Sequence, residues 1–250
     1  GQIDPIFMVE GITDARRRPV LGPPSYAVRT HMIEFDNVSK SFWTGTQRKV
    51  ILDRASFRVE PGNSLGILAP NGTGKTTVIN MMAGLEKPDE GDIRRTSRIS
   101  FPLGFMGGVI NKLSGHENAR FISRLYGLDP DYLEAFCRWL CNLGEYFDMP
   151  VGTYSAGMRA RLSFSLLLAL DFDFYLIDEG MPATTDVEFN KKAGQILRQR
   201  LESATIIVVS HQPETLEKFC RSAAVLMHGQ LHMFDTLEEA KRLYDYEHQA

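Results

Sequence analysis

The sequence has few cysteines and no excess of positive charge. Its 250 residues include three cysteines, Cys137, Cys141 and Cys220, too few for a disulfide framework. Two of them lie four residues apart but lack the second pair that a zinc site needs, so a reducing compartment is expected. The formal net charge is -3, from 28 Lys and Arg against 31 Asp and Glu. A nucleic-acid partner therefore has no electrostatic support, and none is expected.

The sequence also has no apolar run of about 18 residues, the length that a membrane-spanning helix requires. The chain is therefore not expected to form a membrane channel by itself. Residues 1–30 contain a triple arginine and a proline pair, but not the apolar segment of a signal peptide. We expect them to form a flexible N-terminal extension that is solvated, although the arginines could also contact anionic lipid.

What the sequence does contain is a glycine-rich loop between a predicted strand, Ser64–Leu68, and an apolar helix predicted to begin at Val78. The glycines let backbone N–H groups surround phosphate oxygens, and the helix N-terminus adds a positive dipole end. Lys75 can reach the β- and γ-phosphates, and the Thr76 hydroxyl can bind Mg2+. We therefore expect a nucleoside triphosphate to bind to Ala69-Pro70-Asn71-Gly72-Thr73-Gly74-Lys75-Thr76-Thr77. The first position of this pattern is usually glycine rather than alanine.

The rest of the chain fits one layered α/β domain over residues 31–250. Strands are predicted at Ile33–Val38 and Ala55–Val59, ahead of the strand that leads into the loop. Residues from about 112 to 168 have a helical pattern instead, and they are expected to form a small helical subdomain.

Capping signals mark the boundaries inside that subdomain. Ser114 and Glu117 have the spacing of a capping box, and Gly127 is a typical residue to end the helix that they start. Asp129 followed by Pro130 predicts the start of the next helix.

Two further strands end in polar side chains. Phe174–Asp178 is apolar up to Asp178, which we expect to hold the Mg2+ shell, and Glu179 follows, placed to orient or deprotonate the attacking water. A later strand, Ala204–Ser210, delivers His211. Because ligands bind at the carboxyl ends of parallel strands, His211 is a candidate contact for the γ-phosphate.

From about Met32 to Glu239 these motifs, in this order, resemble the ATP-binding subunit of ABC transporters. The discriminating segment is Tyr154-Ser155-Ala156-Gly157-Met158, which is similar to the family's signature loop, usually Leu-Ser-Gly-Gly-Gln. Ser155 is predicted to cap a helix and, with Gly157, to form an anion site. The resemblance implies an ATP-sandwich homodimer, in which each signature loop closes on the ATP held by the other copy. It also implies a P-loop NTPase core with a mixed or parallel sheet, an N-terminal antiparallel β subdomain and a helical subdomain.

The same resemblance implies further site residues. Phe42 falls where the family stacks an aromatic ring on adenine, although its neighbour Trp43 could do so instead, and either could simply pack. Asp186 falls where a loop links the two ATP sites, and His211 falls at the switch histidine.

One family feature is missing. No glutamine occurs between Gln47 and Gln195, where the family places a residue that senses Mg2+ and the membrane partner. The region instead carries the apolar, glycine-rich stretch 101–110. This stretch is either the seat for a helix of a transmembrane subunit or is buried against the chain's own subdomain.

The motifs around residues 101–118 and 154–162 resemble the branch that exports capsular and related cell-surface polysaccharides. The function implied is ATP hydrolysis that powers polysaccharide export through an integral membrane permease, at the cytoplasmic face of the inner membrane. The alternatives are an ABC-type ATPase for a different substrate and a nucleotide-gated regulatory clamp with weak turnover. A P-loop kinase is less expected, because it would need neither Tyr154–Met158 nor His211.

Overall fold

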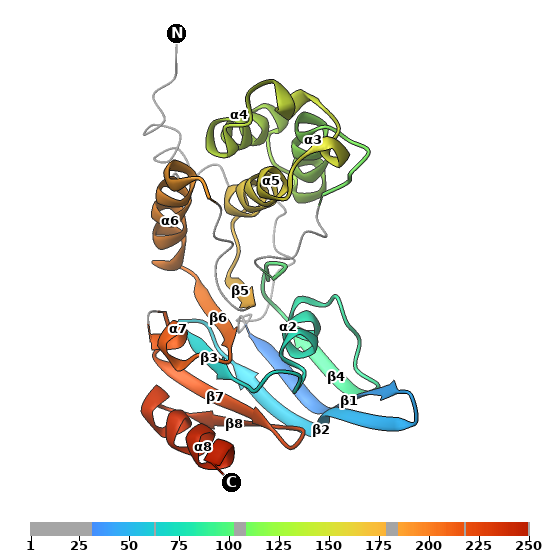
Figure 1. Ribbon diagram of the computed structural model, residues 1–250, viewed down its shortest axis with the longest axis vertical. Coiled ribbons are helices and arrows are strands. Elements are labelled where there is room, and N and C mark those ends of the chain that lie inside the picture. The colour runs from blue at the N-terminus through green and yellow to red at the C-terminus, as the bar shows by residue number, and fades with distance from the viewer. Residues whose placement is uncertain (1–31, 63, 103–108, 179–184, 218, 250) are drawn as a thin grey trace, which may run out of the picture. The chain divides into compact units, whose positions relative to one another are not determined.

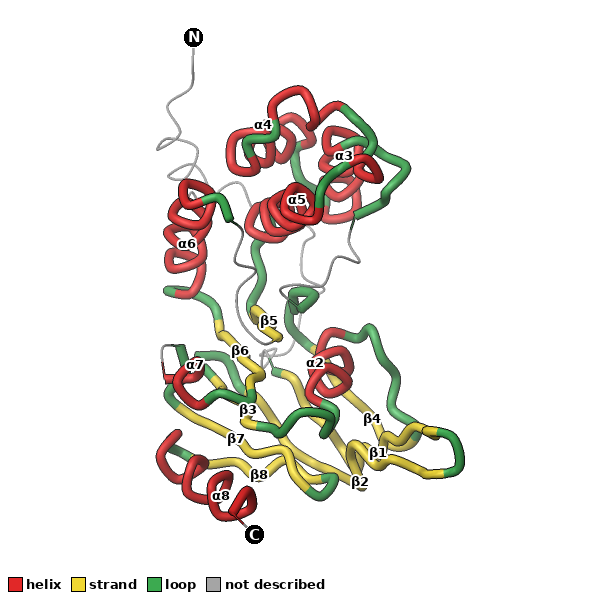
Figure 2. Tube along the Cα trace, in the orientation of Figure 1, coloured by secondary structure: helices red, strands yellow, loops and turns green. Residues whose placement is uncertain are grey.

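The computed structural model describes residues 32–62, 64–102, 109–178, 185–217 and 219–249 (Figures 1 and 2). The chain divides into two compact units. Of the described residues, the first unit contains 32–62, 64–102, 172–178, 201–217 and 219–249, and the second contains 109–171 and 185–200. The N-terminal extension predicted for residues 1–30 lies outside the described residues.

The first unit contains a three-stranded antiparallel sheet in the order β2-β1-β4. Its strands are β1 (Ile33–Thr44), β2 (Gln47–Val59) and β4 (Glu90–Arg95). The rings of Phe35 and Phe57, which are register partners in β1 and β2, stack with their centroids 4.2 Å apart. Both β1 and β2 extend beyond the predicted strands, because their polar ends pair with each other in an exposed hairpin.

The second sheet of this unit has the order β5-β6-β3-β7-β8. Its strands are β3 (Leu65–Leu68), β5 (Phe174–Asp178), β6 (Thr205–Ser210), β7 (Ser222–Met227) and β8 (Gln230–Phe234). Only the β7–β8 pair is antiparallel, which confirms the expected mixed sheet. Leu68 pairs with Ser210, and Asp178 pairs with Val209, so three carboxyl ends meet at one edge.

Among the described residues, the helices that pack against these strands are α2 (Lys75–Ala83), α7 (Pro213–Glu217) and α8 (Leu237–Gln249). The predicted start of α2 at Val78 was wrong. The helix begins at Lys75, because Gly74 adopts φ 110° and turns the backbone directly into the helix, so Lys75–Thr77 form its first turn. The core under α2 is apolar and buried, and includes Ile33, Phe35, Ile67, Val78 and Met81.

The second unit is helical, with α3 (Gly115–Tyr126), α4 (Pro130–Cys141), the 3-10 helices η3 (Gly144–Asp148) and η4 (Val151–Thr153), α5 (Ala156–Ala169) and α6 (Val187–Leu201, its last residue in the first unit). The predicted capping box is present: Ser114 Oγ accepts from Glu117 N at 3.1 Å, and Glu117 Oε2 accepts from Ser114 N at 2.8 Å. Gly127 caps the end of α3. Among the described residues, no helix is long and apolar enough to cross a membrane.

All three cysteines are buried and free. Burial raises the pKa of Cys137 well above its ordinary value, and it raises the pKa of Cys141 and of Cys220 to about 12. These thiols are therefore held in their unreactive neutral form.

Candidate functional site

The glycine-rich loop connects β3 to α2, and its turn depends on the absence of a side chain at Gly74. A Cβ atom on Gly74 would overlap the side chain of Ile51 on β2, and the φ of 110° is itself unfavourable for any other residue. The loop is closed internally by Thr73, whose hydroxyl donates to the Pro70 carbonyl at 2.8 Å. The loop backbone is therefore fixed by local geometry.

Lys75 lies at the start of α2 and is 6% exposed. Its ammonium donates to Asn71 Oδ1 at 2.9 Å and to the Ala69 carbonyl at 3.3 Å, so it bridges the loop internally. A buried ammonium beside backbone N–H groups at a helix N-terminus is a favourable place for phosphate oxygens.

Thr76 and Asp178 are 102 residues apart in the sequence but meet at the edge of the sheet. The Thr76 hydroxyl donates to Asp178 Oδ2 at 2.9 Å and so joins α2 to the end of β5. Hydroxyl and carboxylate oxygens are the hard ligands that Mg2+ prefers, so the donor set fits the predicted metal. In such sites the protein supplies one or two oxygen ligands, and water and phosphate oxygens supply most of the Mg2+ shell.

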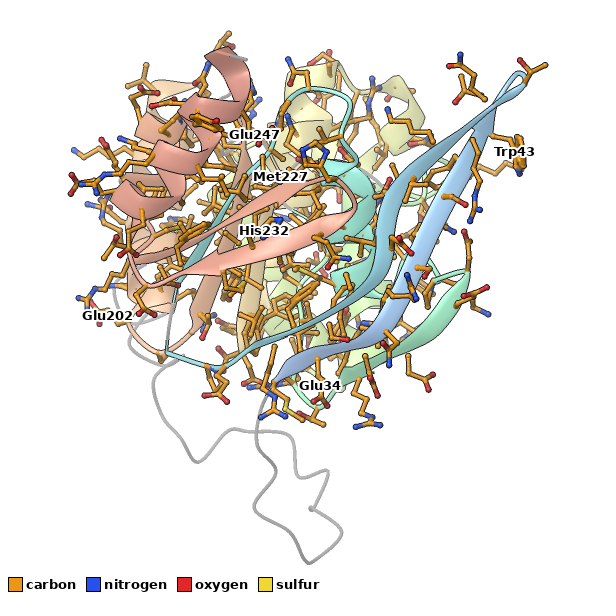
Figure 3. The ribbon with its side chains drawn as sticks, turned by 90° about the horizontal axis from the view of Figure 1, so that it is seen from below. Glu34, Trp43, Glu202, Met227, His232 and Glu247 are labelled. Atoms are coloured by element: carbon orange, nitrogen blue, oxygen red, sulfur yellow. The ribbon has the colours of Figure 1, made fainter. Side chains whose placement is uncertain are left out.

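A cavity of about 700 Å³ brings most of the predicted nucleotide-binding residues together. Its lining includes the predicted residues Phe42, Asn71, Gly72, Gly74, Lys75, Thr76, Thr77 and Asp178. Thr73 instead lines a neighbouring cavity of about 550 Å³. The two predicted carriers of base stacking separate clearly: Phe42 lines the larger cavity, whereas Trp43 is 72% exposed and stands out from the hairpin (Figure 3).

A buried lysine supports the strand that carries Phe42. Lys40 is 8% exposed, and its ammonium pairs with Glu86 at 2.6 Å and with Asp89 at 3.1 Å. Burial lowers the pKa of Lys40, but hydrogen bonds to these two carboxylates outweigh that effect, so the pKa lies above its ordinary value. The cation is therefore kept charged inside the protein.

Of the predicted catalytic residues His211 and Glu179, the structure describes only His211. His211 directly follows β6, which lies between β5 and β3, and its carbonyl accepts from the Tyr244 hydroxyl at 3.3 Å. It is not among the residues that line the larger cavity. Glu179 lies outside the described residues, and its predicted role stays a prediction.

The remaining predicted residues belong to the helical unit. Ser155 caps α5, and its Oγ accepts from Met158 N at 3.2 Å, as the sequence predicted. Ser155 and Gly157 are both exposed. Asp186 precedes α6: its Oδ1 accepts from Phe189 N at 2.9 Å, and its Oδ2 pairs with Arg161 of α5 at 2.7 Å. The ion pair thus joins α5 to the turn at Asp186 within one unit.

Sequence reasoning missed several residues of the larger cavity, namely Thr44, Lys49, Ile51, Asn80 and Pro102. The signal for Lys49 lay in the two-residue turn Gly45-Thr46, which pairs Thr44 with Gln47 and therefore Phe42 with Lys49. Pro102 belongs to the apolar stretch 101–110, of which residues 103–108 lie outside the described part of the chain. Both interpretations of that stretch therefore stay predictions.

Comparisons with known proteins give a consistent result. The family model described as ABC transporter matches residues 52–182. The chain is 41% identical over 214 residues to the ATP-binding protein BexA of Haemophilus influenzae, covering 86% of this chain and 98% of that protein. It is also 41% identical over 214 residues to the capsule polysaccharide export ATP-binding protein CtrD of Neisseria meningitidis serogroup B, covering 86% and 99%.

A third relative is the polysialic acid transport ATP-binding protein KpsT of Escherichia coli, 38% identical over 196 residues, covering 78% of this chain and 87% of that protein. Among solved structures, the dimeric ATP-binding cassette MJ0796 bound to ADP and Pi matches with a TM-score of 0.64. It is 21% identical and covers 82% of this chain and 98% of that one. This structural likeness confirms the fold.

Proposed function

Because the chain belongs to the ABC transporter family, we propose that it binds and hydrolyses ATP to power export of a capsular or other cell-surface polysaccharide. The relatives named for capsule polysaccharide export and polysialic acid transport support the substrate class. The observation that carries the ATPase proposal is the cavity lined by the glycine-rich loop, Lys75 and the Thr76–Asp178 pair.

The loop N–H groups and Lys75 bind and orient the phosphates, and Phe42 stacks on adenine. Thr76 and Asp178 would hold Mg2+, which supplies charge neutralisation for the leaving phosphates. Glu179 orients the attacking water and accepts its proton, with His211 as a contact for the γ-phosphate.

We assign the exposed signature residues to a second copy of the chain. Ser155 Oγ and the N-terminus of α5 favour an anion. Lys75 and its loop already suffice for one triphosphate, so a second anion site is not needed within one subunit. In the proposed homodimer Ser155 and Gly157 close on the partner's ATP, and Asp186 links the two sites. Closure and reopening would move an integral membrane permease, with this chain as a peripheral subunit on the cytoplasmic face of the inner membrane.

Glu179→Gln tests the ATPase proposal. The variant keeps the size of the side chain and one acceptor oxygen but removes its basicity, so phosphate release should fall by at least about a hundredfold while ATP binding persists. Glu202→Gln, a substitution of an exposed glutamate, is the matched control and should retain activity. Gel filtration with ATP should show the Glu179→Gln protein as a dimer. Turnover like that of the parent protein would remove Glu179 from the chemistry.

Export is tested in the source cell. Cells that lack the protein should retain polysaccharide inside, the parent chain should restore surface display, and Glu179→Gln should not. The chain should also co-purify with a membrane protein. Normal surface polysaccharide in the deletion strain, with ATP turnover intact, would overturn the export assignment and leave the ATPase.

A further inference from the structure

The β1–β2 hairpin contributes two side chains to the larger cavity. Phe42 and Lys49 are direct register partners, and both line the cavity of about 700 Å³. Directly opposed residues of an antiparallel pair point to the same face of the sheet, with Cβ atoms roughly 5 Å apart. The aromatic ring proposed for adenine therefore has a cation beside it on the same face.

Lys49 also approaches the phosphate-binding loop itself. Its Nζ lies 3.6 Å from the position that a Cβ atom on Gly72 would occupy. The same side chain lines the neighbouring cavity of about 550 Å³ together with Gly72 and Thr73. The ammonium therefore lies close to Gly72 of the loop.

The charge of Lys49 is not neutralised by the described part of the protein. Two other basic residues of this sheet have acidic partners: Lys40 pairs with Glu86 and Asp89, and Arg58 pairs with Glu34 at 2.9 Å. Among the described residues, no acid lies within ion-pair distance of Lys49, and Asp53 on the same strand pairs with Arg54 at 3.5 Å. A lone cation, backbone N–H groups and a helix N-terminus at one place favour an anion.

We propose that Lys49 is a second phosphate-binding cation, which reaches the nucleotide from the hairpin while Lys75 reaches it from α2. This assignment rests on the proposed function, because it takes the nucleotide in the larger cavity as its ligand. The hairpin then binds both parts of one nucleotide, with Phe42 on the base and Lys49 on the phosphates. It selects for phosphorylated adenosine over adenosine itself.

Calorimetric titrations of the full chain with MgATP, ADP and adenosine test the assignment. Lys49→Ala should weaken MgATP binding about tenfold and flatten its salt dependence, because one charge contact is lost. Adenosine binding should be unchanged, and Lys49→Arg should restore most of the MgATP affinity. Lys191→Ala removes the same charge from an exposed position of α6 and should behave like the parent protein.

These titrations distinguish a phosphate contact by Lys49 from a displacement of the hairpin. Unchanged MgATP affinity in Lys49→Ala overturns the assignment, and so does an equal loss for MgATP and adenosine, which would mean that the hairpin and Phe42 had moved. Thermal unfolding of Lys49→Ala should match that of the parent, since Lys49 is exposed. If the parent protein bound no ATP at all, the proposed function would fail first and this assignment with it.

Discussion

The ammonium of Lys40 lies 5.0 Å from the centroid of the Phe42 ring. The same ammonium donates to the Lys87 carbonyl at 2.9 Å and pairs with Glu86 and Asp89, so the segment after α2 is joined to the strand that carries the ring. A cation held near an aromatic face restricts where that ring can lie. The charge of Lys40 thus helps to position Phe42.

Lys40→Met should destabilise the protein and disturb nucleotide binding. The substitution leaves two carboxylates without their cation; both are partly exposed, so we expect a loss of about 2 kcal/mol in the free energy of unfolding rather than the larger cost of a fully buried pair. Binding of ATP and of adenosine should weaken alike, because the affected group is Phe42. Urea unfolding and titration calorimetry measure the two effects. Lys87→Met, an exposed neighbour, is the control, and equal behaviour of the two variants would contradict the positioning role.

Asp89 makes part of this stability depend on pH. Burial raises its pKa, but hydrogen bonds from the Ser41 N–H and from Lys40 outweigh that effect, so the pKa lies below its ordinary value. A carboxyl whose pKa is lowered by folding stabilises the protein above the unfolded pKa of about 4 and loses that contribution as the pH falls through the folded value.

Unfolding of the parent protein and of Asp89→Asn should therefore be compared from pH 6 down to about pH 3. The difference in stability between them should shrink as the pH falls below about 4, because protonation removes the charge that the amide already lacks. A constant difference across this range would show that the Asp89 charge does not contribute.

The sequence was enough to predict the parts of the site that are local. The capping box at Ser114 and the cap at Ser155 depend on residues within a few positions of each other, and each occurs where its pattern predicted. The glycine-rich loop before α2 was also predicted, although the helix begins at Lys75 rather than at Val78. The strand-end residues Asp178 and His211 were predicted because parallel strands share one edge. The strand order β5-β6-β3-β7-β8 itself is set by long crossover connections.

Other features depend on distant contacts and left no local signal. A lysine in a half-exposed strand is usually solvated, so Lys40 gave no sign of its buried pairing with Glu86, 46 residues away by number. Likewise, Ile51 shows its role only when β2 is placed against the loop, where its side chain occupies the space that a Cβ on Gly74 would need.

Gly74→Ala should abolish nucleotide binding. The new methyl group would overlap Ile51, and the backbone would have to leave φ 110°, so the loop N–H groups would move off the phosphate positions. Gly62→Ala measures the stability cost of a positive φ outside the loop, because Gly62 has φ 89° but no atom within 4 Å of an added Cβ. It should cost stability and keep ATP binding. The double variant Ile51→Ala/Gly74→Ala should recover part of the binding if the overlap dominates, and no recovery would point to the backbone alone.

Thr76→Val should weaken the effect of Mg2+ on ATP binding. Valine keeps the branched shape at the start of α2 but removes the hydroxyl that donates to Asp178, so the metal loses one oxygen ligand while Lys75 and the loop still bind phosphate. In the parent protein, ATP should bind more tightly with Mg2+ than with EDTA. That difference should shrink in Thr76→Val and persist in Thr76→Ser, which keeps the hydroxyl. Valine also removes the hydroxyl that donates to Asp178 Oδ2, so thermal unfolding in EDTA should be measured alongside. A lower midpoint for valine than for serine reports the lost hydrogen bond. A Mg2+ effect on ATP affinity that is as large in Thr76→Val as in the parent protein would contradict the assignment of this hydroxyl to the metal.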